Sequence, residues 1–194
     1  ISTINKQTKA DGQADSLGVA CRIQGVVYGI NTRASGLGFT VKDYTGGIGV
    51  FSSSKTFGYN VKEGDSVMIQ GTIGQFQGTA QIGNLDTIIR RLSGLQLQNP
   101  TIVTAITEKT ESDLVELRRV KLVDPFEWPE SPLNANAWAY VRVEGSTGRI
   151  DTLYIDAESD IDGTTAPKGY LNIAGIGVQF DNKAPYKEKY FLSP

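Results

Sequence analysis

Four acidic residues spaced two apart form the clearest metal-ligand pattern in the sequence. Calcium loops combine converging carboxylates with a glycine that turns the chain, and here Gly163 follows the acidic run. Counted from Glu158, the twelfth position is Gly169, where an EF-hand needs a bidentate glutamate, so that specific loop is excluded. We prefer to interpret this segment as a solvated acidic loop. We expect no cofactor, and calcium is the only alternative that this pattern leaves. The candidate calcium ligands are Asp156, Glu158, Asp160 and Asp162.

Residues for nucleophilic catalysis are scarce. The 194 residues include no histidine and a single cysteine, Cys21, so Ser-His and Cys-His pairs, His-ligated metals and an internal disulfide are excluded. The run 52–55, Ser-Ser-Ser-Lys, has the S-x-x-K spacing of penicillin-recognising enzymes, but the companion S-D-N and K-T-G signatures are missing. We interpret that run as a polar loop and Cys21 as a buried small hydrophobe, and we expect no enzyme activity.

Aromatic and basic residues in the first half fit a nucleic-acid surface, because an OB-type barrel stacks bases on aromatics while Lys and Arg follow the backbone. The first hundred residues hold nine Lys and Arg against six Asp and Glu, whereas residues 101–194 hold ten against fifteen. Any polyanion site is therefore expected in the first half. Packing within the barrel is the simpler account of the same aromatics. The candidate ligand-binding residues, at outward or loop positions, are Tyr28, Arg33, Lys42, Tyr44, Phe57 and Tyr59, supported by Lys55, Arg90 and Arg91.

A second aromatic group lies in the other half, around Pro125, Pro129 and Pro132. Such rings can form a platform for a carbohydrate ring or a protein partner. Sealing of a barrel end by tryptophan and proline is the preferred interpretation. The residues of this group are Phe126, Trp128, Trp138 and Tyr140.

The N-terminal segment is the candidate for assembly. Residues 1–6 favour β structure, and Ile1, Thr3 and Ile4 are the predicted assembly residues. If this segment paired with the sheet edge of another copy, the chain would polymerise head to tail. Pairing within its own chain, or an ordered approach to the barrel, is the preferred alternative. Because the first residue is Ile rather than Met, we expect a mature or cut form from which any signal peptide has been removed.

Short strands separated by Gly-rich turns must position these residues. Apolar residues alternate from Val19 onward, residues 38–43 and 48–51 form a hairpin around 44–47, and further strands follow at 66–73 and 79–90. No convincing amphipathic helix interrupts them. The pattern predicts a five-stranded antiparallel OB-like barrel over residues 19–92.

An internal repeat predicts a second barrel. Residues 67–76 align with residues 171–180 at a constant offset of 104, matching Ile, Gly, Gln and Phe, and residues 137–144 and 149–156 form a second hairpin. We therefore predict an all-β fold of two tandem OB-like five-stranded antiparallel barrels. The boundaries are an N-terminal extension at 1–18, a first barrel at 19–92, a linker at 93–112 and a second barrel at 113–194. No apolar run is long enough for membrane insertion.

Several turn and core segments carry a family resemblance. In the first half they are residues 36–51, 63–67 and 71–73, and in the second half residues 112–115, 123–125, 149–151 and 175–181. These segments resemble the tandem OB-fold modules of large secreted proteins of Gram-negative bacteria. The resemblance implies an extracellular or cell-surface location; the nucleic-acid-binding label that such modules often carry rests on fold analogy alone.

These observations predict a non-catalytic, extracellular structural or interaction protein that works through protein–protein assembly. Its partners are then other protein chains or copies of itself, and strand addition is one route to self-assembly. The alternative is binding of single-stranded nucleic acid or of an extracellular glycan on the open face of the first barrel.

Overall fold

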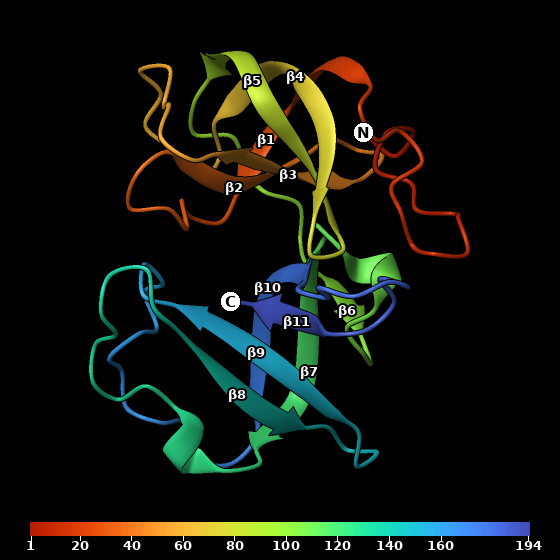
Figure 1. Ribbon diagram of the computed structural model, residues 1–194. Helices are drawn as coiled ribbons and strands as arrows, with labels where there is room; N and C mark the ends of the chain where they lie inside the picture. Colours follow the sequence, from red (N-terminus) through yellow and green to blue (C-terminus); the bar gives the residue numbers. More distant parts are fainter.

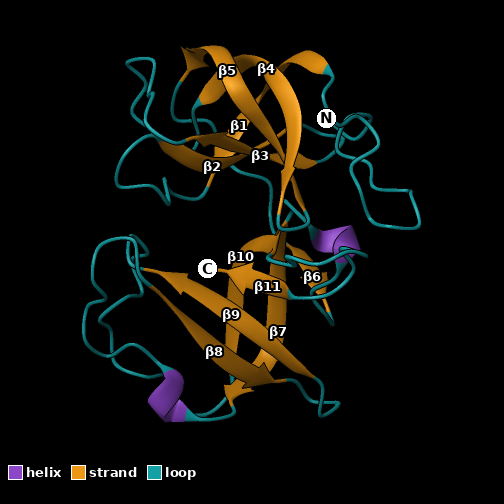
Figure 2. Cartoon of the chain, in the orientation of Figure 1, coloured by secondary structure: helices purple, strands orange, loops and turns teal.

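The computed structural model describes all 194 residues and is an all-β structure (Figures 1 and 2). Five strands of the first half close into a barrel in the order β1-β2-β3-β5-β4, and β4 returns to pair with β1. The barrel predicted in this part of the chain is confirmed. Its strands are β1 (Ala20–Tyr28), β2 (Leu37–Lys42), β3 (Gly47–Ser52), β4 (Ser66–Phe76) and β5 (Thr79–Leu92).

The second half forms a barrel-like sheet with the same pairing scheme. β7 pairs with β8, β8 with β9, β9 with β11, β11 with β10, and β10 pairs back with β7. The chain is therefore two tandem barrel-like domains. The elements are β6 (Thr101–Val103), β7 (Leu114–Leu122), β8 (Trp138–Glu144), β9 (Ile150–Asp156), β10 (Leu171–Gln179) and β11 (Tyr190–Ser193), with short 3-10 helices η1 (Glu108–Thr110) and η2 (Pro125–Glu127).

The third and fifth barrel strands of each domain depart from the purely antiparallel prediction. β3 and β5 are parallel in the first barrel, and β9 and β11 are parallel in the second. The connection between each pair runs through the fourth strand, so the last strand enters the barrel in the direction of the third.

No helix is long and apolar enough to span a membrane.

Alternating apolar residues of the strands fill the two barrel interiors, as expected for strands with one buried face. In each domain the branched side chains on alternate positions are almost fully excluded from solvent. Examples are Val41, Val67, Ile69 and Ile82 in the first core, and Val141, Val143, Leu153 and Ile155 in the second.

The repeated segment occupies the same place in both domains, since it forms most of β4 and of β10. Its shared glycines have the same role. Gly71 faces β5 so closely that a Cβ there would lie 2.7 Å from the carbonyl oxygen of Gly83. Gly175 faces β11, and its Cβ would meet the carbonyl oxygen of Ser193. In both barrels the glycine lets the fourth strand approach the fifth.

The segment predicted as the linker, residues 93–112, contains regular structure. β6 lies inside it and pairs in parallel with β7, and η1 follows before the second barrel begins. Residues 101–112 therefore belong to the second domain. Parallel pairing with β7 was missed because three residues are too short to show alternation.

The N-terminal segment is not a free strand, so the assembly role predicted for Ile1, Thr3 and Ile4 is corrected. The backbone N–H of Ile4 donates to the carbonyl oxygen of Ile1 at 2.9 Å, which closes a turn. The side chains of Ile1 and Ile4 pack against the first barrel core, and Asn5 Nδ2 donates to the Gly47 carbonyl oxygen at 2.7 Å. The two isoleucines that favour a strand are thus half-buried against their own barrel, while Thr3 faces solvent.

Hydrogen bonds at the β4–β5 turn join the two domains. Thr79 Oγ1 donates to the carbonyl oxygen of Gln179 at 2.6 Å and accepts from the backbone N–H of Gln179 at 3.2 Å. Gly78 pairs with Phe180 in an isolated antiparallel bridge. In Figure 1 the strands β2 and β3 lie on the side of the first barrel that faces the second domain.

Candidate functional site

The domain junction covers the face of the first barrel that the sequence predicted for ligands. Tyr28 and Lys42 are buried, with exposed fractions of 4% and 8%. The Tyr28 hydroxyl accepts from the backbone N–H of Gln98, and Lys42 forms an ion pair with Asp113 of the second domain. Both side chains point out of the barrel as predicted, but the second domain and the preceding segment occupy the space in front of them.

Tyr59 is also corrected, because it belongs to the core of the first barrel. Its ring packs 6.1 Å from that of Phe39, and its hydroxyl donates to Asp65 Oδ2 at 3.1 Å. Burial raises the pKa of the Tyr59 phenol to about 12. Tyr59 is therefore not available to a ligand.

The other predicted ligand residues of the first barrel are exposed but scattered. Arg33 lies between β1 and β2, Tyr44 in the turn between β2 and β3, and Phe57 between β3 and β4. Neither Tyr44 nor Phe57 contacts another aromatic ring. The structure therefore does not bring these residues into one site.

The acidic loop after β9 does not form a calcium cage. Asp156 is 5% exposed and accepts from the backbone N–H of Glu158 at 3.0 Å, while Asp162 accepts from the N–H of Leu133. No group of three or more His, Cys, Asp or Glu side chains is placed to hold a metal ion. The Asp156 carboxylate organises a local turn and that of Asp162 joins the loop to the segment at Leu133, so Asp156, Glu158, Asp160 and Asp162 do not converge.

The polar run 52–55 forms a local turn after β3. The Ser52 hydroxyl accepts from the backbone N–H of Lys55 at 3.1 Å. Cys21 is half-buried rather than fully buried, because it lies at the start of β1 and packs at the edge of the core. Burial raises the pKa of its thiol.

A continuous group of five aromatic rings lies on the outer face of the second domain. We call it the aromatic face; it consists of Trp138, Tyr140, Tyr154, Phe180 and Phe191. The Trp138 and Tyr154 rings stack with centroids 6.1 Å apart, and Tyr140 lies 5.8 Å from Tyr154. Tyr140 also lies 5.0 Å from Phe191, and Phe180 lies 4.8 Å from Tyr154. Each ring therefore contacts at least one other, and the five form one surface.

Strand register explains why these rings meet. In the β8–β9 hairpin Tyr140 is directly opposite Tyr154, and Trp138 is opposite Asp156. Because side chains alternate along a strand, Val141 and Leu153 point into the core while these residues point outward. β11 lies on the other side of β9 and adds Phe191 to the same face.

The aromatic face is open to solvent in spite of its apolar character. Trp138 is 52% exposed and Tyr140 is 45% exposed, while the other three rings are half-buried. Exposed apolar patches of this kind mark interaction sites. Four of the rings lie on the second, third and fifth barrel strands, and Phe180 directly follows the fourth. OB-like barrels bind ligands on the face of strands two and three and on the neighbouring loops.

Charged groups beside the aromatic face are largely neutralised. Arg142 follows Tyr140 on the outer side of β8, and its Nε and Nη2 atoms lie 2.7 Å and 2.5 Å from Glu127 Oε1. Burial raises the pKa of the Asp156 carboxyl and, above its ordinary range, that of the Tyr154 phenol. The face therefore offers rings and phenol hydroxyls rather than a strip of cations.

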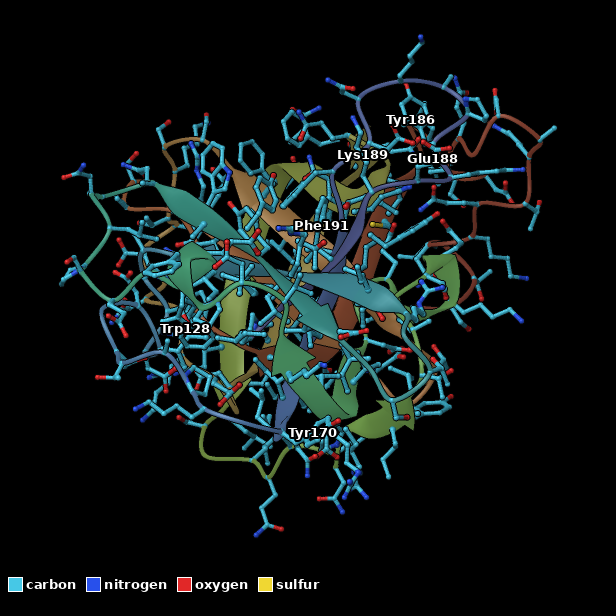
Figure 3. All side chains as sticks on the ribbon, turned by 90° about the horizontal axis from the view of Figure 1, so that it is seen from below. Trp128, Tyr170, Tyr186, Glu188, Lys189 and Phe191 are labelled. Atoms are coloured by element: carbon cyan, nitrogen blue, oxygen red, sulfur yellow. The ribbon has the colours of Figure 1, made fainter.

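The sequence singled out only part of this site. Trp138 and Tyr140 belong to the aromatic face, but Trp128 is 7% exposed and its indole N–H donates to the Thr164 carbonyl oxygen at 3.0 Å. Figure 3 shows Trp128 well separated from Phe191. Phe126 is 97% exposed and contacts no other ring.

Tyr154, Phe180 and Phe191 were missed. The predicted hairpin of residues 137–144 and 149–156 contained Tyr154, but a four-residue turn at 145–148 would pair residue 140 with residue 153. The structure instead pairs Glu144 with Ile150, and this shift of one residue places Tyr154 opposite Tyr140. Phe180 and Phe191 come from the start of the β10–β11 loop and from β11, and no local pattern connects them to β8.

Comparison of the sequence with known protein families and with curated proteins finds no match. The resemblance to secreted OB-fold modules thus stays a prediction. The function of this chain is inferred from the geometry of the aromatic face.

Proposed function

We propose that this chain is a non-catalytic binding module that holds a saccharide chain on the aromatic face. The single observation that carries the proposal is the continuous set of five exposed or half-buried rings, four of them on the second, third and fifth strands of an OB-like barrel and Phe180 directly after the fourth. Pyranose rings present apolar C–H faces that pack on aromatic rings, and their hydroxyls suit flanking phenol and carboxyl groups. The phenols of Tyr140 and Tyr154 supply such hydroxyls beside Trp138.

Charge favours a saccharide over single-stranded nucleic acid. Both ligands stack on aromatic rings, but nucleic acid also needs cations along its backbone. Residues 101–194 carry ten Lys and Arg against fifteen Asp and Glu, and Arg142 beside the face is paired with Glu127. A neutral or weakly charged chain suits this setting better than a polyphosphate.

An extracellular location belongs to the same proposal. It is supported by the resemblance to secreted modules and by the chemistry of the proposed ligand, since saccharide chains are abundant outside cells. Protein–protein assembly is retained only as an outcome of the experiments below, because the N-terminal segment packs on its own barrel.

Binding of defined oligosaccharides to the wild-type protein and to Trp138→Ala tests the proposal. Loss of the exposed indole is expected to weaken binding at least about tenfold, or ~1.4 kcal/mol, as for a central aromatic contact. Titration calorimetry measures the affinity, and quenching of tryptophan emission by iodide reports protection of Trp138, because Trp128 is already buried.

Phe126→Ala is the matched control, since it removes an exposed ring of the same domain that lies outside the aromatic face. This variant is expected to bind as the wild type does. The proposal fails if no oligosaccharide binds. It also fails if Trp138→Ala instead abolishes binding of a single-stranded oligonucleotide, or abolishes concentration-dependent oligomers seen by light scattering.

A further inference from the structure

The two exposed rings of the aromatic face both lie on β8, and the next outward residue of that strand is an arginine. Trp138 and Tyr140 are 52% and 45% exposed, whereas the other three rings are half-buried. Arg142 lies on the same side of β8, because Val141 and Val143 point into the core. Outward positions recur about every 7 Å along a strand, so an extended ligand that covers the two rings and continues along β8 reaches Arg142 next.

A glutamate of the loop before β8 holds Arg142 in place. The Nε and Nη2 atoms of Arg142 lie 2.7 Å and 2.5 Å from Glu127 Oε1, and the backbone N–H of Arg142 donates to Glu127 Oε2 at 2.8 Å. The hydrogen bonds from Arg142 lower the pKa of the Glu127 carboxyl, so the pair stays ionised. Glu127 is itself the last residue of η2, which Asp124 caps by accepting from the backbone N–H of Phe126 at 3.0 Å. Both charged groups are thus fixed before a ligand arrives, which lowers the entropic cost of binding.

The pair keeps hydrogen-bonding capacity that the protein does not use. No hydrogen bond forms at Nη1 of Arg142, and Oε2 of Glu127 accepts only the backbone N–H. The Arg142 side chain is 49% exposed and that of Glu127 is 22% exposed. Free N–H donors therefore lie beside a carboxylate oxygen that can accept one more hydrogen bond. Two adjacent hydroxyls complement this arrangement, since one can accept from the guanidinium while the other donates to the carboxylate.

We propose that the Arg142–Glu127 pair continues the binding site along β8 and selects saccharide units that present two adjacent free hydroxyls. The inference rests on the proposed function and names the class of saccharide, which is a neutral, unbranched chain whose internal units keep a vicinal diol. Because the two charges of the pair cancel, this selection requires no charge on the ligand. The rings supply contact with the apolar faces of the sugar, and the pair supplies specificity.

Two glucans of the same composition test this selection. Internal units of a 1,4-linked β-glucan keep ring hydroxyls on the second and third carbons, which are adjacent, whereas those of a 1,3-linked β-glucan keep them on the second and fourth, which are not. The wild type is expected to bind cellohexaose about tenfold more tightly than laminarihexaose in titration calorimetry. In Arg142→Ala this ratio is expected to fall to about one, through weaker binding of cellohexaose alone.

Two further variants separate selection by the pair from a general effect of a lost ion pair. Glu127→Gln keeps the shape of the side chain but removes its charge, and it is expected to reduce the preference for cellohexaose. Arg118→Ala is the matched control, since Arg118 is 52% exposed and pairs with Glu116 at 2.8 Å on β7, a strand that carries no ring of the aromatic face. This control is expected to keep the full preference.

The possible outcomes distinguish this inference from the proposed function. A wild type that binds both hexamers equally or prefers laminarihexaose overturns this inference alone, and so does an Arg142→Ala variant that keeps the preference. Absence of binding to both hexamers overturns the proposed function.

Discussion

At the residue scale, Glu111 is the most unusual titratable group of the chain. It lies directly before the second barrel, and its carboxylate accepts from the backbone N–H of Ala80 at 3.0 Å and from Gln7 Nε2 at 3.1 Å. Glu108 and Asp113 line the same polar cavity of about 300 Å³. Burial, reinforced by the charge of Glu108, raises the pKa of the Glu111 carboxyl to about 8. This acid therefore titrates near neutrality in a chain that has no histidine.

We expect Glu111 to make stability fall as pH rises. The folded pKa is about 8 and the ordinary value is 4.5, so between these two pH values the folded state holds a proton that the unfolded chain releases. In Glu111→Gln the fall of the free energy of unfolding between pH 5 and pH 9 is expected to be smaller than in the wild type, by on the order of 2 kcal/mol. Urea denaturation at a series of pH values measures this. An unchanged slope in the variant would show that the carboxyl does not titrate in this range.

At the element scale, the fourth strand of each barrel depends on one glycine. Gly71 lies in β4 at a break in the register with β5, between Gln70 and Thr72. A Cβ at Gly71 would approach the Gly83 carbonyl oxygen to 2.7 Å and the Ile82 side chain to 2.9 Å. The repeated segment was recognised from sequence by this glycine, and the structure supplies the contact that requires it.

Gly71→Ala is expected to destabilise the protein by about 1–3 kcal/mol, because a backbone atom blocks the added methyl group. Gly83→Ala is the control: it adds the same methyl group to β5, where nothing lies within 4 Å. Thermal unfolding of both variants checks the prediction. If Gly71→Ala is as stable as Gly83→Ala, then β4 can move away from β5 without loss of free energy of unfolding, and the prediction is wrong.

At the scale of the whole molecule, the two barrels act as one body because they share hydrogen bonds, an ion pair and a cavity. Thr79 satisfies both backbone groups of Gln179, and Lys42 pairs with Asp113. This junction buries Tyr28 and Lys42 of the first barrel and leaves the outer face of β8 and β9 in solvent.

Thr79→Val tests the junction, since it keeps the shape of the side chain and removes its hydroxyl. We expect a loss of about 1–3 kcal/mol, because the carbonyl oxygen and N–H of Gln179 lose their partner. Differential scanning calorimetry is also expected to show a single transition in the wild type that broadens or splits in the variant. Thr87→Val, in the same strand and without a side-chain hydrogen bond, is the control; equal effects of the two substitutions would contradict this role of Thr79.

The sequence by itself determined the strands, the barrel of the first half and the repeat that places a second barrel after it. These features depend on local rules: alternation of apolar residues, glycine-rich turns such as the one at residues 44–47, and the shared Ile-Gly and Gln-Phe positions of β4 and β10. Successive side chains of a strand point to opposite faces, so the position of a residue in the alternation predicts its side. We therefore expected outward or barrel-end positions for Tyr28, Lys42, Trp138 and Tyr140.

Only the tertiary structure decided which outward face stays free. Alternation along a strand cannot distinguish Tyr28, which is buried at the domain junction, from Tyr140, which remains in solvent. The difference comes from contacts between residues far apart in the chain. The same holds for Phe180 and Phe191, which reach Tyr140 and Tyr154 only through the closure of the barrel by β11. Strand identity is a local property of this chain, whereas its candidate site is made by long-range pairing and by the contact between its two domains.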